Sequence, residues 1–350
     1  MEHSEVLVTN LSKFGLPKRS APAVTFSMLK ENQTSHCVLM VRPRTFGFNP
    51  EAATSNAFAR RPADPDSSSR AVREFDGVAE ALDRNGVQVI VLQEQAGPDR
   101  PDAIFPNNWV SFHADGTIVL YPMAAEARRL EVDTEALLPL LDGAGYIVRR
   151  TVDLIAYASD GHFLEGTGSL ILDRPRRRAF ASRSVRTDPK VIAEFDRELR
   201  YSTFQFDAFD HLGRPIYHTN VLLCLGTEFA ILCSEVVPET QRSELIERLG
   251  RTVVEVSYDQ LRQFACNSIE LRGRDDTPII AMSSAALASL TGQQVRQLER
   301  FGNPVTAPIP TIESVGGGSV RCMIANVHLP KRNAHGLIAV ASESPVSHQM

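Results

Sequence analysis

The 350-residue sequence lacks three features, each of which would have indicated a class of protein. No apolar run approaches the roughly 20 residues that a transmembrane helix needs. The N-terminus shows no charged start followed by an apolar segment, so export is not expected. The formal net charge is −5, whereas binding to nucleic acid requires a basic surface. We therefore expect neither a membrane nor a nucleic-acid partner.

Cysteine is scarce, and its spacing is not that of a metal site or a disulfide framework. The five cysteines are odd in number, form no CxxC pair, and lie in no Cys/His cluster with zinc-ligand spacing. This predicts free thiols in a reducing, cytoplasmic setting, with no metal and no cofactor. One of these thiols could be reactive. The cysteines are Cys37, Cys224, Cys233, Cys266 and Cys322.

The composition is that of a globular protein with a sizeable core, since 43% of the residues are hydrophobic and 23% charged. Residues 1–36 are predicted to be a flexible N-terminal extension, 37–330 a single domain, and 331–350 a C-terminal tail. Ordered structure is expected to begin with a buried strand at 37–42, "CVLMVR". A helix should follow at 66–86, capped by serine at its start and ended by Gly86. Residues 87–92 then predict another buried strand.

A polar cluster that leads into a short hairpin recurs along the rest of the chain. The markers of these segments are 57, 53, 49 and 55 residues apart, and helical stretches lie between them. A near-constant spacing in this range indicates a closed repeat architecture. We therefore predict an α/β fold of five units, each with two or three strands and a helix, around one axis. The polar clusters would then meet at a central opening; their markers are Asn108, Glu165, His218, Asn267 and Cys322.

Three side chains in these clusters could carry chemistry, although each has an ordinary structural explanation when taken alone. Cys322 follows a run of three glycines at a predicted strand start, but free cysteine is commonly buried and inert. His218 could be a hydrogen-bonded strand residue, and Glu165 could close a glycine-rich turn. Their appearance at equivalent repeat positions favours a shared site over three separate structural roles.

The motifs "FPNNW", "EGTGS", "YHTN" and "GGGSVRCM", in this order and spacing, resemble those of the guanidine-modifying, or pentein, superfamily. The resemblance covers about residues 37–330 and is strongest to the citrulline utilisation hydrolase, or amidinotransferase-like, branch. It implies a five-bladed α/β propeller of ββαβ-type repeats. It also implies that Cys322 is the nucleophile and that His218 and Glu165 complete the catalytic set.

These residue types suit attack on a ureido or guanidino carbon, which resonance makes a poor electrophile. A thiolate is the strongest nucleophile that side chains offer near neutral pH. His218 could protonate the departing nitrogen and later deprotonate the hydrolytic water. Glu165 could accept a charge-assisted hydrogen bond from a substrate N–H group.

The sequence departs from the deiminase pattern at positions where a guanidinium would meet carboxylates. Deiminases carry an Arg-Asp pair at the place of Asn107 and Asn108, and an aspartate at the place of Asn220. An amide offers both a donor and an acceptor, which suits a neutral ureido group. Two alternatives stay open: the asparagines could cap turns, and dihydrolases of the superfamily also use asparagine while accepting a guanidine.

An α-carboxylate on the substrate would need a cation. The segment "SRSVRTD" resembles the family's Ser-x-Arg-Thr stretch and indicates Arg186, with Arg128 and its neighbour Arg129 as second candidates. Asn267 could line the pocket. Residues 44–58 are a plausible lid, and the basic run 174–178 is expected to be a water-exposed hairpin turn.

The sequence thus predicts a cysteine-dependent hydrolase of C–N bonds other than peptide bonds. Its substrate would be citrulline or a close derivative, converted to ornithine, CO₂ and ammonia. The alternatives are an arginine deiminase or dihydrolase, an amidinotransferase, and a non-catalytic propeller that binds a macromolecule. The expected partner is a small amino-acid substrate, with a homo-oligomer possible.

Overall fold

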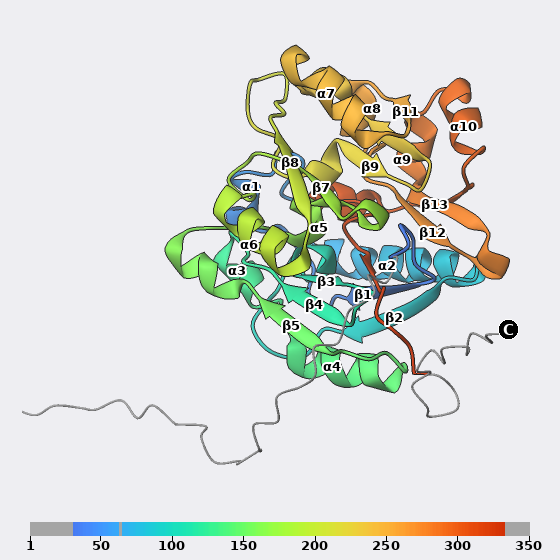
Figure 1. Ribbon diagram of the computed structural model, residues 1–350. Helices are drawn as coiled ribbons and strands as arrows, with labels where there is room; N and C mark the ends of the chain where they lie inside the picture. Colours follow the sequence, from blue (N-terminus) through green and yellow to red (C-terminus); the bar gives the residue numbers. More distant parts are fainter. Residues whose placement is uncertain (1–30, 63–64, 333–350) are drawn as a thin grey trace, which may run out of the picture. The chain divides into compact units, whose positions relative to one another are not determined.

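The computed structural model describes residues 31–62 and 65–332, and its strands form five three-stranded sheets (Figure 1). The sheets have the strand orders β15-β1-β2, β3-β4-β5, β6-β7-β8, β11-β10-β9 and β12-β13-β14. The strands are β1 (Cys37–Arg42), β2 (Gln88–Gln93), β3 (Val110–Phe112), β4 (Thr117–Leu120), β5 (Arg150–Asp153), β6 (Ile171–Asp173), β7 (Arg178–Ser182), β8 (Ser202–Phe206), β9 (Leu223–Leu225), β10 (Phe229–Leu232), β11 (Thr252–Glu255), β12 (Ile269–Arg272), β13 (Pro278–Ser283), β14 (Asn303–Ala307) and β15 (Ala325–Asn326).

Every sheet repeats one pairing pattern. Its middle strand pairs antiparallel with one neighbour and parallel with the other, as β4 does with β3 and β5. Val119 lies opposite Ser111 on one side and Val152 on the other. The parallel pair needs a crossover, and a helix supplies it in each unit. The predicted α/β class and the recurrence of hairpin and helix are therefore confirmed.

The longer helices lie outside the sheets, with α4, α6, α7 and α10 at the bottom, left, top and right of Figure 1. In α6, Val191, Ile192, Phe195 and Leu199 are buried at helical spacing, and Asp188 caps the first turn. The helices are α1 (Pro50–Ala53), α2 (Ser67–Arg84), α3 (Glu126–Arg129), α4 (Thr134–Gly143), α5 (Gly166–Ser169), α6 (Pro189–Leu199), α7 (Glu239–Leu249), α8 (Tyr258–Arg262), α9 (Ser284–Ser289) and α10 (Gly292–Leu298).

One sequence-based expectation about a helix needs correction. The cap of α2 is Asp66, which makes no side-chain cap bond, so the expected serine cap does not form. Gly86 does follow the end of the helix, with a φ of +85°. The stretch 284–302 is two helices, because Thr291 and Gln294 form a capping box that starts α10.

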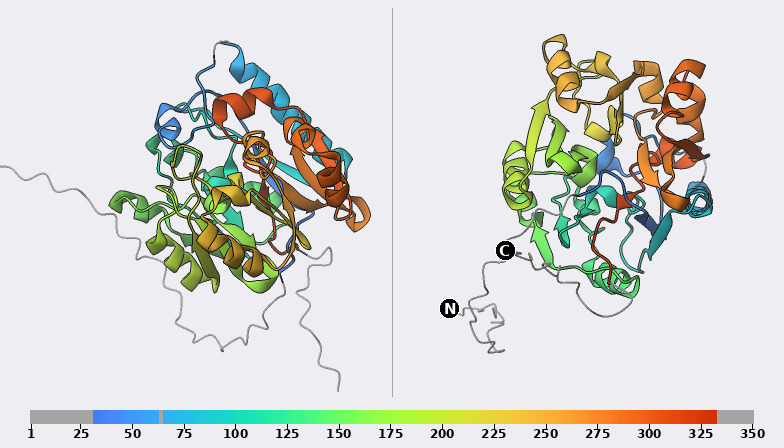
Figure 2. Two further views of the ribbon diagram at one scale, coloured as in Figure 1. Left: turned by 90° about the horizontal axis from the view of Figure 1, so that it is seen from above. Right: turned by 45° about the vertical axis from the view of Figure 1, so that its right-hand side comes forward.

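In each sheet, the strand that pairs antiparallel with the middle strand is called here its first strand. Neighbouring sheets contact one another through these short first strands and through the turns before them. β15 contacts β3, α5 contacts β3, β9 contacts both β6 and β12, and α2 contacts β14 of the last sheet. The first strands β3, β6, β9, β12 and β15 together line one small cavity of about 50 Å³. These contacts bring the five polar clusters toward one place. Figure 2 gives two further views of this arrangement.

Residues 31–36, part of the predicted N-terminal extension, pack against the rest of the described chain. The predicted domain bounds stay a prediction. Glu31 is buried and forms an ion pair with Arg174, and Gln33 donates to Leu172 O and Leu225 O. Arg174 is itself buried, which corrects the expectation that the run 174–178 is wholly exposed. At the other end, the Arg332 amide donates to Gly145 O. The rest of the predicted extension and tail lies outside the described residues.

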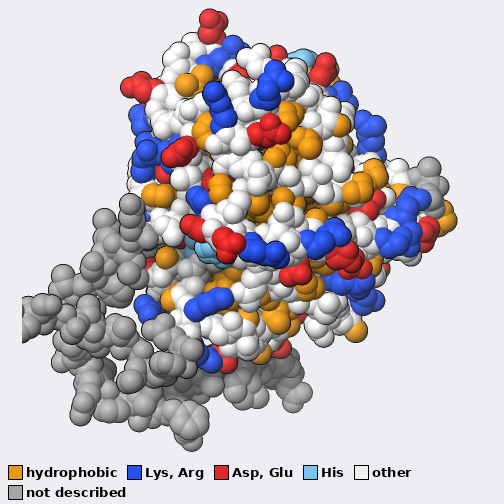
Figure 3. Space-filling view, turned by 90° about the vertical axis from the view of Figure 1, so that its right-hand side faces the viewer, with side chains coloured by type: hydrophobic (Ala, Val, Ile, Leu, Met, Phe, Trp, Pro, Cys, Tyr) orange, Lys and Arg blue, Asp and Glu red, His pale blue; other side chains and the backbone are white. Residues whose placement is uncertain are grey.

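The surface seen in Figure 3 carries basic and acidic side chains interspersed, in line with the small net charge. Within residues 31–62 and 65–332, no helix is long and apolar enough to cross a membrane.

Candidate active site

The three side chains predicted to be catalytic come from turns that precede the first strands of three sheets. Glu165 lies before α5 and β6, His218 before β9, and Cys322 in a turn before β15. The sequence suggested that Cys322 lies at the start of a strand, but the structure places it in the turn before β15. Glu165 is 0% exposed, His218 2% and Cys322 4%, so all three are closed off from solvent. The His218 Nε2 and Glu165 Oε2 atoms are 2.8 Å apart.

Two neutral amides surround the Cys322 sulfur. Asn220 Nδ2 lies 3.4 Å from Sγ and Asn267 Nδ2 lies 3.3 Å from it. Asn267 also accepts from the Cys322 amide through Oδ1, at 3.4 Å. Both asparagines were predicted to be site residues, and both donate to the sulfur. Such donors stabilise a thiolate without placing a negative charge beside it.

The glycines before Cys322 allow the chain to pack tightly over the site. Gly317 has a φ of +64°, and a Cβ there would lie 2.6 Å from the Ala59 amide nitrogen. Its carbonyl accepts from the Tyr217 hydroxyl at 2.7 Å and from Asn56 Nδ2 at 3.1 Å. The segment 49–60 therefore covers the turn that carries Cys322.

Glu165 is a buried carboxylate that interacts with several charged or polar groups of the site. Oε1 accepts from the Ala124 amide at 3.0 Å, and Oε2 accepts from Arg186 Nη1 at 3.1 Å. Burial opposes the charged form, but Arg186, His218 and Arg128 outweigh it and hold the pKa of Glu165 well below its ordinary value. Glu165 is thus ionised at neutral pH.

His218 is neutral at the same pH. Burial lowers its pKa to about 4, although the hydrogen bond to Glu165 acts in the opposite direction. A carboxylate only accepts hydrogen bonds, so the proton on the ring belongs to Nε2. Nδ1 is then left with a free lone pair and can take up a proton during a reaction.

Arg128 is buried in a cluster that also fixes Asn108. Its guanidinium donates two bonds of 2.9 Å to Glu131 and one of 3.0 Å to Asn108 Oδ1, and Asp102 lies 3.8 Å away. Asn108 Nδ2 donates to Glu165 O at 3.4 Å. Both the oxygen and the nitrogen of the Asn108 side-chain amide therefore have hydrogen-bond partners within the protein. Sequence reasoning missed Glu131 and Asp102, although the spacing of three residues between Arg128 in α3 and Glu131 in the turn that follows could have indicated the pair.

Asn107 and Asn220 keep side-chain atoms without a partner. Asn107 is 0% exposed, and neither Nδ2 nor Oδ1 of its amide has a hydrogen bond within the described residues. Asn220 Oδ1 is likewise unpaired there. Buried polar atoms without partners are costly, and a polar ligand could satisfy them.

Arg186 ties Glu165 to the covering segment. Nη2 donates to Ala52 O at 2.6 Å, and Nε donates to Ser55 Oγ at 2.9 Å. The guanidinium also lies 4.9 Å from the centre of the Tyr217 ring. The guanidinium of Arg186 is thus already bonded to protein groups. A substrate carboxylate could reach it only if the segment around Ser55 moved, and the predicted role of Arg186 in binding that carboxylate stays a prediction.

Replacing Gly168 with alanine should damage the site without removing any functional group. A Cβ at this position would lie 2.3 Å from Asn108 Nδ2 and 2.8 Å from His218 Nδ1. We expect Gly168→Ala to lower kcat by roughly 10²-fold, the weight of a displaced general acid or base. Gly292→Ala, which replaces an exposed helix glycine, is the control. A near-normal kcat in Gly168→Ala would show that His218 tolerates displacement.

The other four cysteines are also buried. Burial raises the pKa of Cys37 to about 11 and those of Cys224 and Cys233 to about 12, and it raises that of Cys266 as well. Among residues 31–62 and 65–332, no group of three or more His, Cys, Asp or Glu side chains could hold a metal ion.

The chain is similar to a known protein family and to several solved structures. The family model of eukaryotic N,N dimethylarginine dimethylhydrolase matches residues 42–329. No curated protein matches the chain. Among solved structures, apo ArgZ, an arginine dihydrolase of the cyanobacterial ornithine-ammonia cycle, superposes with a TM-score of 0.66 at 18% identity, over 85% of this chain and 41% of that one.

Two shorter chains match over nearly their whole length. The N-terminal domain of ArgZ bound to substrate has a TM-score of 0.64 at 17% identity and covers 84% of this chain and 99% of that one. A dimethylarginine dimethylaminohydrolase adduct with S-methyl-L-thiocitrulline has a TM-score of 0.56 at 14% identity, with coverages of 83% and 98%. At these identities the structures show the fold alone, while the family match spans most of the chain. The predicted superfamily is therefore confirmed, and the chain belongs to the N,N dimethylarginine dimethylhydrolase family of the guanidine-modifying, or pentein, superfamily.

Proposed function

We propose that this protein hydrolyses the ureido group of citrulline or a close derivative, giving ornithine, CO₂ and ammonia, with Cys322 as the nucleophile. The observation that carries the proposal is the charge around the sulfur. Its polar neighbours Asn220 and Asn267 are neutral amides, and Glu165, which bonds His218, is already paired with Arg186. A guanidinium would therefore find no free carboxylate there, whereas a ureido group can pair with amides.

The proposed reaction follows from the chemistry of the three side chains. The Cys322 thiolate would attack the ureido carbon, and the C–N bond to the departing nitrogen would break as that nitrogen takes up a proton. Neutral His218 would take up this proton from the Cys322 thiol at Nδ1, deliver it to the departing nitrogen, and later remove one from the water that cleaves the carbon–sulfur bond. The carbamate released by that water then loses CO₂, which breaks the second C–N bond. One water is consumed overall, since citrulline and water together give ornithine, CO₂ and ammonia. Glu165 would keep the His218 ring oriented.

The repeat contacts support the predicted ring. We propose that the five sheets form a closed, pseudo-symmetric five-bladed propeller, because each has the same pairing pattern and the last contacts the first through α2 and β14. All five first strands line the same small cavity, as expected if they surround an axis.

Hydrolysis of a guanidino group is the second candidate. The matched family is named for dimethylarginine hydrolysis, and ArgZ is named as an arginine dihydrolase. Amides can also bind a guanidinium, although without charge pairing. The matching family is one of hydrolases, which favours hydrolysis over the amidinotransferase and non-catalytic alternatives.

A substrate panel tests the proposal. We would measure kcat/KM for citrulline, arginine and N,N-dimethylarginine, and identify ammonia, ornithine, citrulline and dimethylamine among the products. Citrulline is expected to be the preferred substrate and to yield ornithine. Consumption of arginine or dimethylarginine with no action on citrulline would establish the second candidate instead.

Asn220→Asp should shift the preference toward guanidines. The new carboxylate beside Sγ would pair with a guanidinium and repel a ureido oxygen, and effects on the thiol itself cancel in the citrulline-to-arginine ratio of kcat/KM. We expect this ratio to fall by roughly tenfold or more, within the range seen when buried polar groups lose their partners. Asn303→Asp, at an exposed position on β14, should leave it unchanged. An unaltered ratio in Asn220→Asp would mean that specificity is set elsewhere.

A further inference from the structure

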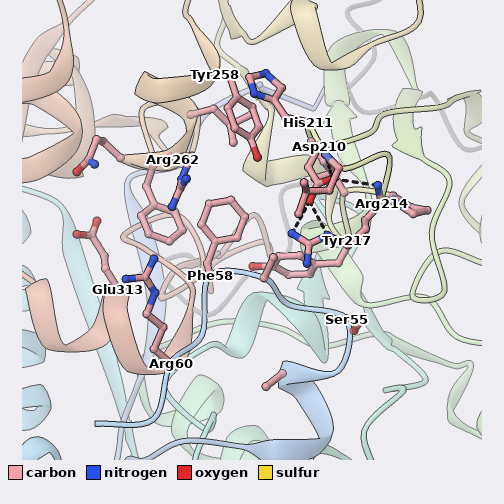
Figure 4. Close-up of a pocket in the computed structure, with 18 of the residues that line it drawn as sticks. Ser55, Phe58, Arg60, Asp210, His211, Arg214, Tyr217, Tyr258, Arg262 and Glu313 are labelled. Atoms are coloured by element: carbon pink, nitrogen blue, oxygen red, sulfur yellow. Dashed lines mark hydrogen bonds and ion pairs between the residues drawn. The ribbon is translucent and has the colours of Figure 1, made fainter. Parts of the chain in front are cut away.

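A large cavity lies beside the candidate active site and is not explained by the reaction. It has a volume of about 850 Å³, and Cys322, His218 and Glu165 are not among its lining residues. Its walls come from the covering segment, the loop 210–217, α8 and the turn before η7 (Ile312–Gly316), as Figure 4 shows. Phe58 projects between Tyr217 and Phe264, with ring centres 6.3 and 5.1 Å away.

Hydrogen bonds connect the lining of this cavity to the candidate active site. Ser55 and Tyr217 line the cavity, and each also bonds to the site below. Ser55 Oγ accepts from Arg186, which bonds Glu165, while Tyr217 donates to Gly317. Since the reactive side chains are closed off from solvent, the end of a substrate farthest from Cys322 would point toward this cavity.

The charged groups of the cavity are not balanced locally. Asp210 pairs with Arg214 at 2.7 Å, and Glu313 accepts from Ser319 at 2.7 Å. Arg60 and Arg262 line the cavity on the side opposite Asp210 and Arg214 (Figure 4), and neither guanidinium has a hydrogen bond or ion pair within the described part of the chain.

The volume is also larger than a free amino acid needs. Cavities of about 300–1,000 Å³ typically hold ligands of drug size. We infer that the cavity is a subsite for an extension on the substrate's α-amino group, and that this extension ends in a carboxylate bound by Arg60 and Arg262. The inference rests on the proposed function, since it names the substrate as an Nα-acylated ureido amino acid. The apolar middle of the acyl chain would pack against Phe58 and Tyr217.

Kinetics with matched substrates test this subsite. We would compare citrulline, Nα-pentanoylcitrulline and Nα-glutarylcitrulline, the last two differing only in the terminal carboxylate. The glutaryl compound should have a kcat/KM roughly tenfold or more above the pentanoyl compound, as expected for hydrogen bonds to a charged group. Arg60→Gln combined with Arg262→Gln should abolish this difference, while Arg300→Gln, at an exposed site away from the cavity, should keep it.

Binding separates failure of the subsite from failure of the proposed reaction. Affinities of Nα-glutarylornithine and Nα-pentanoylornithine, measured by calorimetry, do not depend on turnover. Tighter binding of the glutaryl compound, lost in the double variant, would support the subsite even if citrulline derivatives were not hydrolysed. Equal binding of the two, or a higher kcat/KM for free citrulline than for its glutaryl derivative, would overturn it.

Discussion

Cys322→Ser is expected to reduce turnover by roughly 10⁴-fold or more, which is the scale seen when a covalent nucleophile is removed. A serine hydroxyl is a far weaker acid than a thiol, so the neutral His218 ring cannot readily convert it into the anion that attacks the ureido carbon. The change is nearly isosteric, and the amides of Asn220 and Asn267 can donate to the hydroxyl as they do to the sulfur. The fold should therefore persist, as measured by circular dichroism and thermal unfolding.

Cys37→Ser serves as the control for the nucleophile. Cys37 is a buried strand residue whose thiol donates to a backbone carbonyl, and it lies in a different hydrophobic cluster from Cys322. Its replacement should leave kcat close to that of the wild type, although some stability can be lost. More than a few per cent of wild-type activity in Cys322→Ser would remove Cys322 from the nucleophile role.

Glu165→Gln is expected to have the largest effect on stability. The carboxylate is 0% exposed and balances the buried charges of Arg186 and Arg128, which would keep their charge after the substitution. Removing one partner of a buried ion pair costs about 3–5 kcal/mol. Glu194→Gln removes a partly exposed carboxylate that pairs with the exposed Arg197, and should change the free energy of unfolding by about 1 kcal/mol or less. Urea unfolding at pH 7 measures both.

The same substitution should change the acid dependence of stability. Because the folded-state pKa of Glu165 is depressed, its stabilisation is complete above the unfolded value of about 4.3 and shrinks as the pH falls below it. The difference in unfolding free energy between wild type and Glu165→Gln should therefore narrow between pH 5 and pH 3. A difference that stays constant over this range would mean that Glu165 is not charged in the folded protein.

Loss of Glu165 should also impair catalysis through His218. The carboxylate orients the ring and fixes the proton on Nε2, while a glutamine amide can present either a donor or an acceptor. We expect kcat to fall by roughly 10²-fold, with KM changed less. A change confined to KM would instead assign Glu165 a role in binding the substrate.

Much of the fold could be predicted, and candidate reactive residues could be named, because the signals are local. Short apolar runs bounded by glycine and asparagine predict strands wherever they occur, and the recurrence of these segments every 49–57 residues indicates repeated units. The glycine run before Cys322 could be recognised for the same reason, since a positive φ or a close approach restricts the residue type at that position itself.

Contacts between distant segments were decided only by the tertiary structure. The carboxylate role of Arg186 stays a prediction, but only the structure shows that Arg186 bonds Ser55, which is 131 residues away, and Glu165. The basic run at 174–178 looked exposed, but Arg174 is buried because it pairs with Glu31, 143 residues earlier. The sequence by itself determined which residues could react and how often the structural unit repeats. Which charges neutralise one another depends on packing between units, because a buried charge is tolerated only where a partner is brought to it.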